Sequence, residues 1–225
     1  MSVFDQIRAG DLTGIKRCFA HGEDIDTRDE EGMTPLLSSI RQRSVDIALF
    51  LIESGADIEQ KDDQENSPLL YAAALGEIEV VKALVQKGAD ANAANNIGWT
   101  PLKMALELPD EKTARFLTEN GADVNAVDKN GWPLIHWALE QPGPGFLKLL
   151  IEKGADVNSK CKSGWTALHW AVDLEDTCFT KILLENGAEV NARDNHGRTP
   201  LDWAVDNSKK EHVKLLLQYG ACSES

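Results

Sequence analysis

The sequence predicts an all-α solenoid, in which short helical units of equal length are stacked in a row. Three features of the 225-residue chain support this fold class. A glycine, usually followed by alanine, returns every 33 residues; a Thr-Pro-Leu triplet or a variant of it keeps the same interval, and so does a leucine between the two. Markers that keep one interval without slipping indicate a stacked array of repeats.

The first unit in chain order is incomplete. Residues 3–9 and 13–21 are each expected to form a short helix, with a turn between them. The opening triplet of the later units is missing here. Because the end of a stack needs a layer whose outer side tolerates water, we expect residues 1–21 to be a partial N-terminal capping repeat. About six further repeats follow to residue 221, and residues 1–225 are expected to form a single domain.

Each later unit is expected to contain a polar loop and two helices. In the unit that begins at Gly22, the Thr34 hydroxyl can cap the first helix, and Pro35 suits its first position. The second helix carries Leu51 and ends near Gly55, since glycine adopts the left-handed conformation of a helix end without steric cost. The opening triplet recurs as Ser67-Pro68-Leu69, Thr100-Pro101-Leu102, Pro133-Leu134-Ile135, Thr166-Ala167-Leu168 and Thr199-Pro200-Leu201. The leucine column continues as Leu84, Leu117, Leu150, Leu183 and Leu216.

The pattern Gly-x-Thr-Pro-Leu-x-x-Ala, followed by Leu-Leu-x-x-Gly-Ala-Asp-Val-Asn, resembles the ankyrin repeat. The resemblance covers residues 22–221 strongly and residues 3–21 weakly. It implies a β-turn finger and two antiparallel helices in each repeat, with the repeats stacked into a slightly curved solenoid. It also implies protein–protein binding, generally without catalysis.

Some positions depart from this pattern. Trp132-Pro133-Leu134 lacks the capping hydroxyl, which should cost about 1 kcal/mol in that repeat. The glycine that usually stands between the two helices is present only at Gly76, and it is replaced elsewhere by Arg43, Pro109, Pro142, Glu175 and Ser208. We expect the first helix before residues 141–145, Gln-Pro-Gly-Pro-Gly, to end early and the loop to be unusual.

The composition narrows the classes of partner and compartment. A formal net charge of −14 argues against nucleic acid and anionic membranes and leaves basic proteins and peptides open. No apolar stretch approaches the ~20 residues that span a bilayer, and the start of the chain carries no pattern of a secretory signal. Four cysteines without a C-x-x-C pair indicate a reducing compartment, the alternative being one disulfide between two of them. We therefore expect a cytoplasmic monomer.

No residue set predicts catalysis, a cofactor or a metal site. His136 and His169 occupy the position where the ankyrin family usually has a histidine that bonds loop backbone between repeats, which is a structural role. Phosphate-binding glycine loops and the common hydrolase motifs are missing. The carboxylates are spread over loops and helix ends, and no acid/base pair stands out. We expect no enzyme activity and no cofactor.

Two rows of tryptophans run through the repeats. Trp99, Trp132 and Trp165 lie in the fingers, at a position that the family varies on its concave surface. Tryptophan is a preferred anchor in protein interfaces, so these three are candidate partner-binding residues; the alternative is that each ring packs against the neighbouring finger and helix, and both can hold because indoles are often half-buried. The second row lies on the first helices of the repeats and is expected to belong to the core. It consists of Trp137, Trp170 and Trp203.

Four carboxylates also recur at the repeat interval. They are Glu107, Glu140, Asp173 and Asp206. Aligned carboxylates repel one another, and a cationic partner would relieve this; the alternative is an ordinary charged surface. The sequence thus predicts a protein that binds a basic segment of another protein on its concave face. An alternative function is that of a dedicated inhibitor or immunity protein that masks a basic toxin or enzyme.

Overall fold

The structure is a computed structural model that describes residues 2–108 and 111–222. All regular secondary structure in these ranges is helical, so the predicted all-α class is confirmed. Pro109, one of the predicted departures, lies outside them. Two isolated antiparallel bridges occur in the loops before the helices, between Val127 and Pro133 and between Lys160 and Thr166. We call each such loop, for example residues 88–99, a finger.

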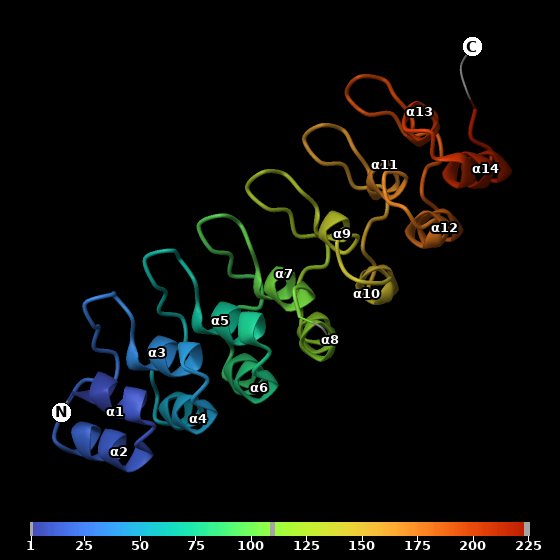
Figure 1. Ribbon diagram of the computed structural model, residues 1–225. Helices are drawn as coiled ribbons and strands as arrows, with labels where there is room; N and C mark the ends of the chain where they lie inside the picture. Colours follow the sequence, from blue (N-terminus) through green and yellow to red (C-terminus); the bar gives the residue numbers. More distant parts are fainter. Residues whose placement is uncertain (1, 109–110, 223–225) are drawn as a thin grey trace. The chain divides into compact units, whose positions relative to one another are not determined.

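Each repeat contributes a first helix, which follows the finger, and a second helix (Figure 1). The first helices are α1 (Val3–Ala9), α3 (Pro35–Arg41), α5 (Pro68–Leu75), α7 (Pro101–Leu106), α9 (Leu134–Trp137), α11 (Ala167–Ala171) and α13 (Pro200–Asp206). The second helices are α2 (Leu12–Ala20), α4 (Val45–Glu53), α6 (Ile78–Gln86), α8 (Lys112–Glu119), α10 (Gly145–Glu152), α12 (Cys178–Glu185) and α14 (Lys210–Gln218). The two helices predicted in the first unit are therefore present as α1 and α2.

The chain forms two compact units, one up to Asp123 and one from Val124 onward. In the first unit, α3 packs against α4 of its own repeat and against α1 and α5 of its neighbours. In the second unit, α11 packs against α12 and contacts both α9 and α13. Every member of the leucine column, from Leu51 to Leu216, is fully buried. Each repeat thus depends on its neighbours to bury its apolar faces.

Capping follows the sequence pattern closely. The side chains of Thr34, Ser67, Thr100 and Thr199 each accept the backbone N–H three residues later, and proline occupies the first turn of the helices that follow. Pro133 has no such bond, and α9 is only four residues long. The predicted early end of this helix is therefore confirmed. The chain continues through residues 138–144, where Gly143 has a φ of 123°, before α10 begins.

The turn between the two helices of a repeat requires a left-handed residue in several repeats. Gly76 adopts this conformation with a φ of 71°, and Arg43 and Ser208, which replace glycine in the same column, adopt it with a φ of 57°. A side chain is strained in this region. A glycine at either position is therefore compatible with the observed turn.

Asparagines tie consecutive fingers together. Asn158 Oδ1 accepts the backbone N–H of Glu189 at 2.8 Å, and its Nδ2 donates to Gly187 O at 3.1 Å. In the first unit, Asn92 makes the equivalent pair of bonds to Asp123 and Gly121, at 2.7 and 3.0 Å. These amides hold the start of each finger in register with the next, so they belong to the scaffold.

Candidate protein-binding surface

Each finger tryptophan of the second unit packs against a helix tryptophan of the following repeat. The Trp132 and Trp170 indoles meet at a centroid distance of 4.9 Å and an interplanar angle of 74°. Trp165 and Trp203 meet at 4.6 Å and 72°. Edge-to-face contact of this kind contributes about 0.5–1.5 kcal/mol beyond the burial of area. The two pairs therefore brace consecutive repeats against each other.

These four indoles are all half-buried. Trp132 and Trp165 do pack against the adjoining helix, as one of the two hypotheses for the finger row predicted. They also keep exposed surface, which the anchor hypothesis requires. The second row was expected to belong to the core, but Trp137, Trp170 and Trp203 are all only half-buried. A finger indole covers Trp170 and Trp203 on one side.

Trp99, in the first unit, binds a cation of its own repeat. Lys103 Nζ lies 4.6 Å from the centroid of the Trp99 ring. The same ammonium forms an ion pair with Glu107. Lys103 is only 4% exposed, and a desolvated cation over a tryptophan face is bound more strongly than an exposed one. Trp99 and Glu107 thus hold one lysine between them.

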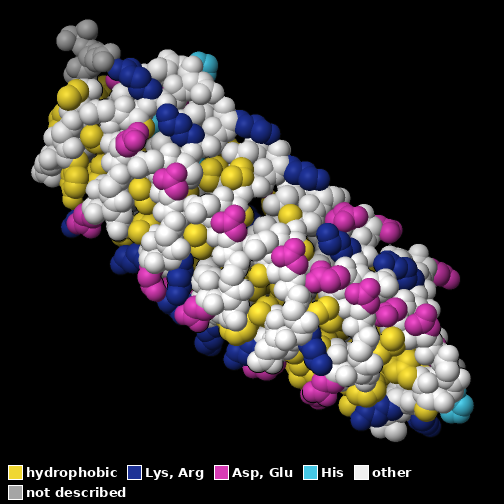
Figure 2. Space-filling view, turned by 180° about the vertical axis from the view of Figure 1, so that it is seen from behind, with side chains coloured by type: hydrophobic (Ala, Val, Ile, Leu, Met, Phe, Trp, Pro, Cys, Tyr) yellow, Lys and Arg dark blue, Asp and Glu magenta, His cyan; other side chains and the backbone are white. Residues whose placement is uncertain are grey.

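The four carboxylates of the predicted acidic row are all exposed. Glu107, Glu140 and Asp173 occupy equivalent places, because each donates its backbone N–H to the carbonyl three residues earlier, at 3.2, 3.2 and 3.0 Å. Glu107 is paired with Lys103. In the ranges that the structure describes, Glu140, Asp173 and Asp206 pair with no cation of the chain. On the face shown in Figure 2, acidic, basic and hydrophobic side chains are interspersed.

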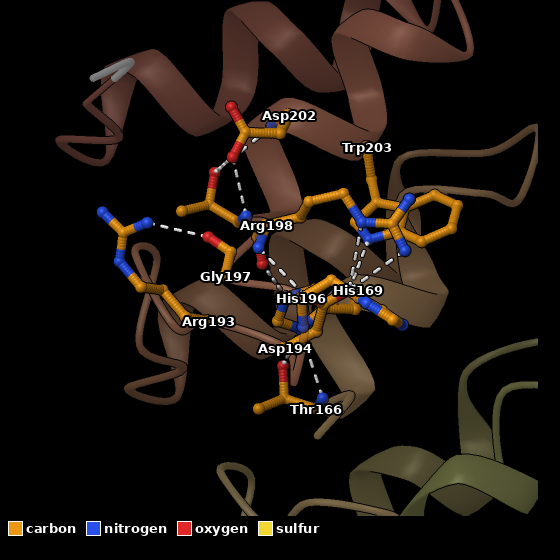
Figure 3. A network of polar contacts seen from close by, with 10 residues as sticks. Thr166, His169, Arg193, Asp194, His196, Gly197, Arg198, Asp202 and Trp203 are labelled. Atoms are coloured by element: carbon orange, nitrogen blue, oxygen red, sulfur yellow. Dashed lines mark hydrogen bonds and ion pairs between the residues drawn. The ribbon is translucent and has the colours of Figure 1, made fainter. Parts of the chain in front are cut away.

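Asp194 organises the finger of the last repeat (Figure 3). Its Oδ1 accepts the backbone N–H groups of His196 and Arg198 at 2.8 and 3.0 Å. Its Oδ2 accepts Trp203 Nε1 at 3.3 Å and lies 3.2 Å from the Arg198 guanidinium. That guanidinium lies 3.8 Å from the centroid of the Trp203 ring. Burial alone would raise the pKa of Asp194, but these donors and the Arg198 charge lower it to about 2.

His136 and His169 both have the predicted structural role. His169 Nδ1 accepts the Thr166 N–H at 3.2 Å, so its Nε2 carries the proton and donates to Arg198 O at 3.2 Å. His136 Nε2 lies 3.2 Å from Trp165 O. Burial lowers the pKa of His169, and it lowers the pKa of His136 to about 4. Both rings are therefore neutral linkers between repeats near pH 7.

Pro133 leaves one of these histidines incompletely bonded. In His169, the Nδ1 atom accepts the backbone N–H of Thr166. In His136, the same atom is buried and has no hydrogen-bond partner. Pro133 occupies the place of Thr166 in this repeat, and proline has neither a backbone N–H nor a hydroxyl. The missing donor thus follows directly from the sequence departure.

Other kinds of site receive no support from the described ranges. They contain no group of three or more His, Cys, Asp or Glu residues that could hold a metal ion. None of the four cysteines, which are Cys18, Cys161, Cys178 and Cys222, forms a disulfide in these ranges. Among the residues that the structure describes, no helix has the length and apolar character needed to cross a membrane.

Comparison with known families decides the identity of the repeats. One family model, described as ankyrin repeats (3 copies), matches residues 57–128 and 135–224, and a second, described as ankyrin repeats (many copies), matches residues 3–52. The chain belongs to the ankyrin repeat family. The resemblance predicted from the sequence is therefore confirmed, and it includes the first repeat. Ankyrin repeats are protein–protein interaction modules, so a protein partner is expected of this chain.

A solved structure is similar over nearly the whole ankyrin chain. It is the ankyrin repeat domain of Bcl-3, described as a unique member of the IkappaB protein family. The two share 26% sequence identity with a TM-score of 0.87, and the match covers 97% of this chain and 98% of that one. The comparison with curated proteins gave no match.

Sequence reasoning missed three features of this ankyrin surface. It did not foresee that Lys103, on the first helix of its repeat, would bind Trp99 at the end of the preceding finger. It did not foresee Arg198 over Trp203, although Arg198 stands in the finger tryptophan column. It also predicted no contact for His212, which is buried and lies 3.0 Å from Thr180 Oγ1 and 3.1 Å from Leu174 O. That contact joins residues more than 30 positions apart and follows no motif.

Proposed function

We propose that this ankyrin protein binds another protein through one surface of its second unit, and that the partner presents a basic segment there. We call it the tryptophan–acid surface. It consists of Trp132, Trp165, Trp170, Trp203, Glu140, Asp173 and Asp206. The observation that carries the proposal is the combination, in consecutive repeats, of half-exposed indoles with exposed carboxylates that no cation of the described chain neutralises.

Rigid, half-buried tryptophans suit an interface for two reasons. Each offers a large amphipathic face to a partner. Because the Trp132 and Trp165 rings already rest on Trp170 and Trp203, they lose little conformational entropy on binding, and pre-organisation of this kind favours affinity. The exposed acids add attraction for a basic partner and act mainly on the association rate and on specificity.

Two of the residues predicted from sequence receive a smaller role in this proposal. Trp99 and Glu107 are engaged with Lys103, so they have less capacity to bind a cation of another protein. The finger of the last repeat is similar, since Arg198 covers Trp203 and is paired with Asp194. The repeats that carry Trp132 and Trp165 are therefore proposed as the centre of the interface.

The experiment has two steps, capture of the partner and measurement of its affinity. The partner is captured from the source cell on the immobilised protein and identified by mass spectrometry, and its Kd is then measured with purified components. Replacing Trp132 and Trp165 together by alanine is expected to weaken binding by at least about 30-fold, the effect of losing one interface hot spot. Tyr219→Ala, an exposed aromatic residue outside the surface, is the control and should bind like wild type. An unchanged Kd for the double variant would rule out the proposed surface.

A further inference from the structure

We propose that two pairs of residues, Trp132 with Glu140 and Trp165 with Asp173, each bind a lysine or arginine side chain of the partner. The inference rests on the proposed function and makes it more specific. Its basis is a contact within the chain, because Trp99 and Glu107 already bind Lys103 in this way.

The Lys103 contact shows what the finger tryptophan and the acid of one repeat can hold. The ammonium lies over the Trp99 ring and is ion-paired with Glu107. The three residues are four positions apart along the chain, and so are Trp132, His136 and Glu140. Glu107 and Glu140 each donate the backbone N–H to the carbonyl three residues earlier. The two acids therefore stand at the same point of their repeats.

In the next two repeats, no cation of the described residues lies over the finger tryptophan. The place of Lys103 is taken by His136 and His169, whose rings are fully buried. Each is hydrogen-bonded to a backbone carbonyl of the next repeat, and both are neutral near pH 7. Trp132 and Trp165 therefore have a neutral imidazole beside them, at centroid distances of 5.5 and 6.4 Å, instead of an ammonium. The acids of these repeats, Glu140 and Asp173, are left without a partner on the described chain.

The last repeat contains a second example of a cation held by an indole and a carboxylate of the chain. Its finger carries Arg198 in the column of the finger tryptophans, and this guanidinium lies over Trp203 while it pairs with Asp194. In chain order, Trp132 and Trp165, which contact no cation of the described residues, thus lie between the Trp99 ring that holds Lys103 and the Trp203 ring that holds Arg198. At Trp99 and at Trp203, a cation of the chain is held over the indole face by a cation–π contact.

Repeat geometry then fixes the spacing of the partner's cations. Helices α9 and α11 are neighbours, and packed helices lie about 8–10 Å apart. An α-helix rises about 1.5 Å per residue, so basic residues seven positions apart match this spacing. In a polyproline II segment, which rises about 3.1 Å per residue with three residues per turn, the matching separation is three positions. The occupant is thus a protein segment with two basic side chains at one of these spacings.

The direct test uses N-acetyl-arginine amide as the probe and the indole N–H signals of the tryptophans in NMR spectra of the ¹⁵N-labelled protein. We expect the Trp132 and Trp165 signals to shift in a saturable way, and the Trp99 signal to stay in place because Lys103 occupies its face. Glu140→Gln should weaken the response at Trp132 about three- to five-fold and spare Trp165, because an exposed ion pair contributes up to roughly 1 kcal/mol. Asp173→Asn should do the reverse.

Two controls make the result specific. N-acetyl-glutamine amide, which is neutral, should move none of these signals. Glu185→Gln removes one charge from α12, outside the surface, and should leave the response to arginine unchanged. Equal weakening by Glu185→Gln and Glu140→Gln would show general attraction by the acidic protein and would overturn the proposal. So would the absence of any shift at Trp132 and Trp165.

A gain of binding provides the complementary test. Lys103→Met keeps an unbranched side chain but removes the cation, so Trp99 should now respond to N-acetyl-arginine amide. If the Trp99 signal of a folded Lys103→Met protein stays in place, a finger tryptophan and the acid of its repeat do not suffice to bind a basic side chain. Failure here differs from failure of the proposed function: a captured partner whose affinity depends on Trp132 and Trp165 would still establish the surface, without the cation contacts.

Discussion

The indole of Trp132 meets the indole of Trp170 edge to face at 4.9 Å, and the two residues come from consecutive repeats. The same rings therefore hold the repeats together and offer a surface to a partner. This dual use has a practical consequence, because removal of a ring changes stability as well as binding. Every affinity measured on a tryptophan variant needs a measurement of folding beside it.

The first prediction concerns this aromatic pair. Trp132→Ala and Trp170→Ala should each destabilise the protein, and the double variant should lose about 0.5–1.5 kcal/mol less than the sum, since one contact is removed in both single variants. Urea unfolding followed by circular dichroism measures the free energies. The Trp132 and Trp203 pair, whose rings are not in contact, serves as the control and should be additive. Additivity in the Trp132 and Trp170 cycle would mean that the contact contributes nothing.

The second prediction concerns the missing cap of α9. Pro133→Thr should stabilise the protein by about 1 kcal/mol, because the hydroxyl can cap the helix. Its N–H can also satisfy the buried Nδ1 of His136, as Thr166 does for His169. Pro133→Val supplies the N–H without the hydroxyl and should recover only part of the gain. A Thr variant no more stable than the Val variant would show that the hydroxyl does not cap this helix.

The third prediction concerns pH. Burial lowers the pKa of His136 to about 4 from an ordinary 6.5, so the folded state favours the neutral ring. The stability due to this ring is complete above about pH 6.5 and is lost as the pH falls toward 4. Between pH 7 and pH 5 the loss should be about 2 kcal/mol. Burial shifts the pKa of His169 and His212 in the same direction, which adds to the slope.

The pH prediction is checked by urea unfolding at several pH values. His136→Gln keeps a donor for Trp165 O but does not titrate, so its stability should depend less steeply on pH between 7 and 5. The exposed His196 is the matched control, and His196→Gln should keep the wild-type slope. A wild-type slope in His136→Gln would contradict the assignment of the pH dependence to this ring.

The fourth prediction concerns the Asp194 network. Asp194→Asn removes the charge that holds Arg198 over Trp203, and it should cost about 2 kcal/mol at neutral pH. Because the pKa of Asp194 is lowered to about 2, its stabilisation is present above about pH 4 and is lost as the pH falls toward 2. The variant should lack this acid-range loss. Asp206→Asn, at an exposed carboxylate, should change neither the stability nor its pH dependence.

Much of the fold was predictable because the repeat interval reveals local structure. Thr34 and Pro35 predict a capped helix start, and the fully buried Leu51 shows why the same apolar position recurs in every unit. The short α9 followed from Pro133 and the prolines and glycines of residues 141–145. Local rules suffice in these cases, because each repeat contacts mainly its neighbours.

The contacts of the candidate surface were harder to predict because they depend on side-chain reach. The columns place Trp132 and Trp165 one repeat apart, but they do not show that each ring leans on the helix of the next repeat. Lys103 stands where the next two repeats have His136 and His169. Only the structure shows that its ammonium reaches both Trp99 and Glu107. A column indicates which residues are equivalent and leaves their contacts open.

The most direct test of the tryptophan–acid surface is a charge reversal measured against the captured partner. Glu140→Lys with Asp173→Lys should weaken the Kd at least about 100-fold, since like charges in an interface cost several kcal/mol. Glu185→Lys with Glu211→Lys changes the net charge equally on α12 and α14 and should weaken it less than about three-fold, as expected for screened, distant charges. Equal losses in the two double variants, or no loss in the first, would contradict the central claim that this surface binds a basic segment.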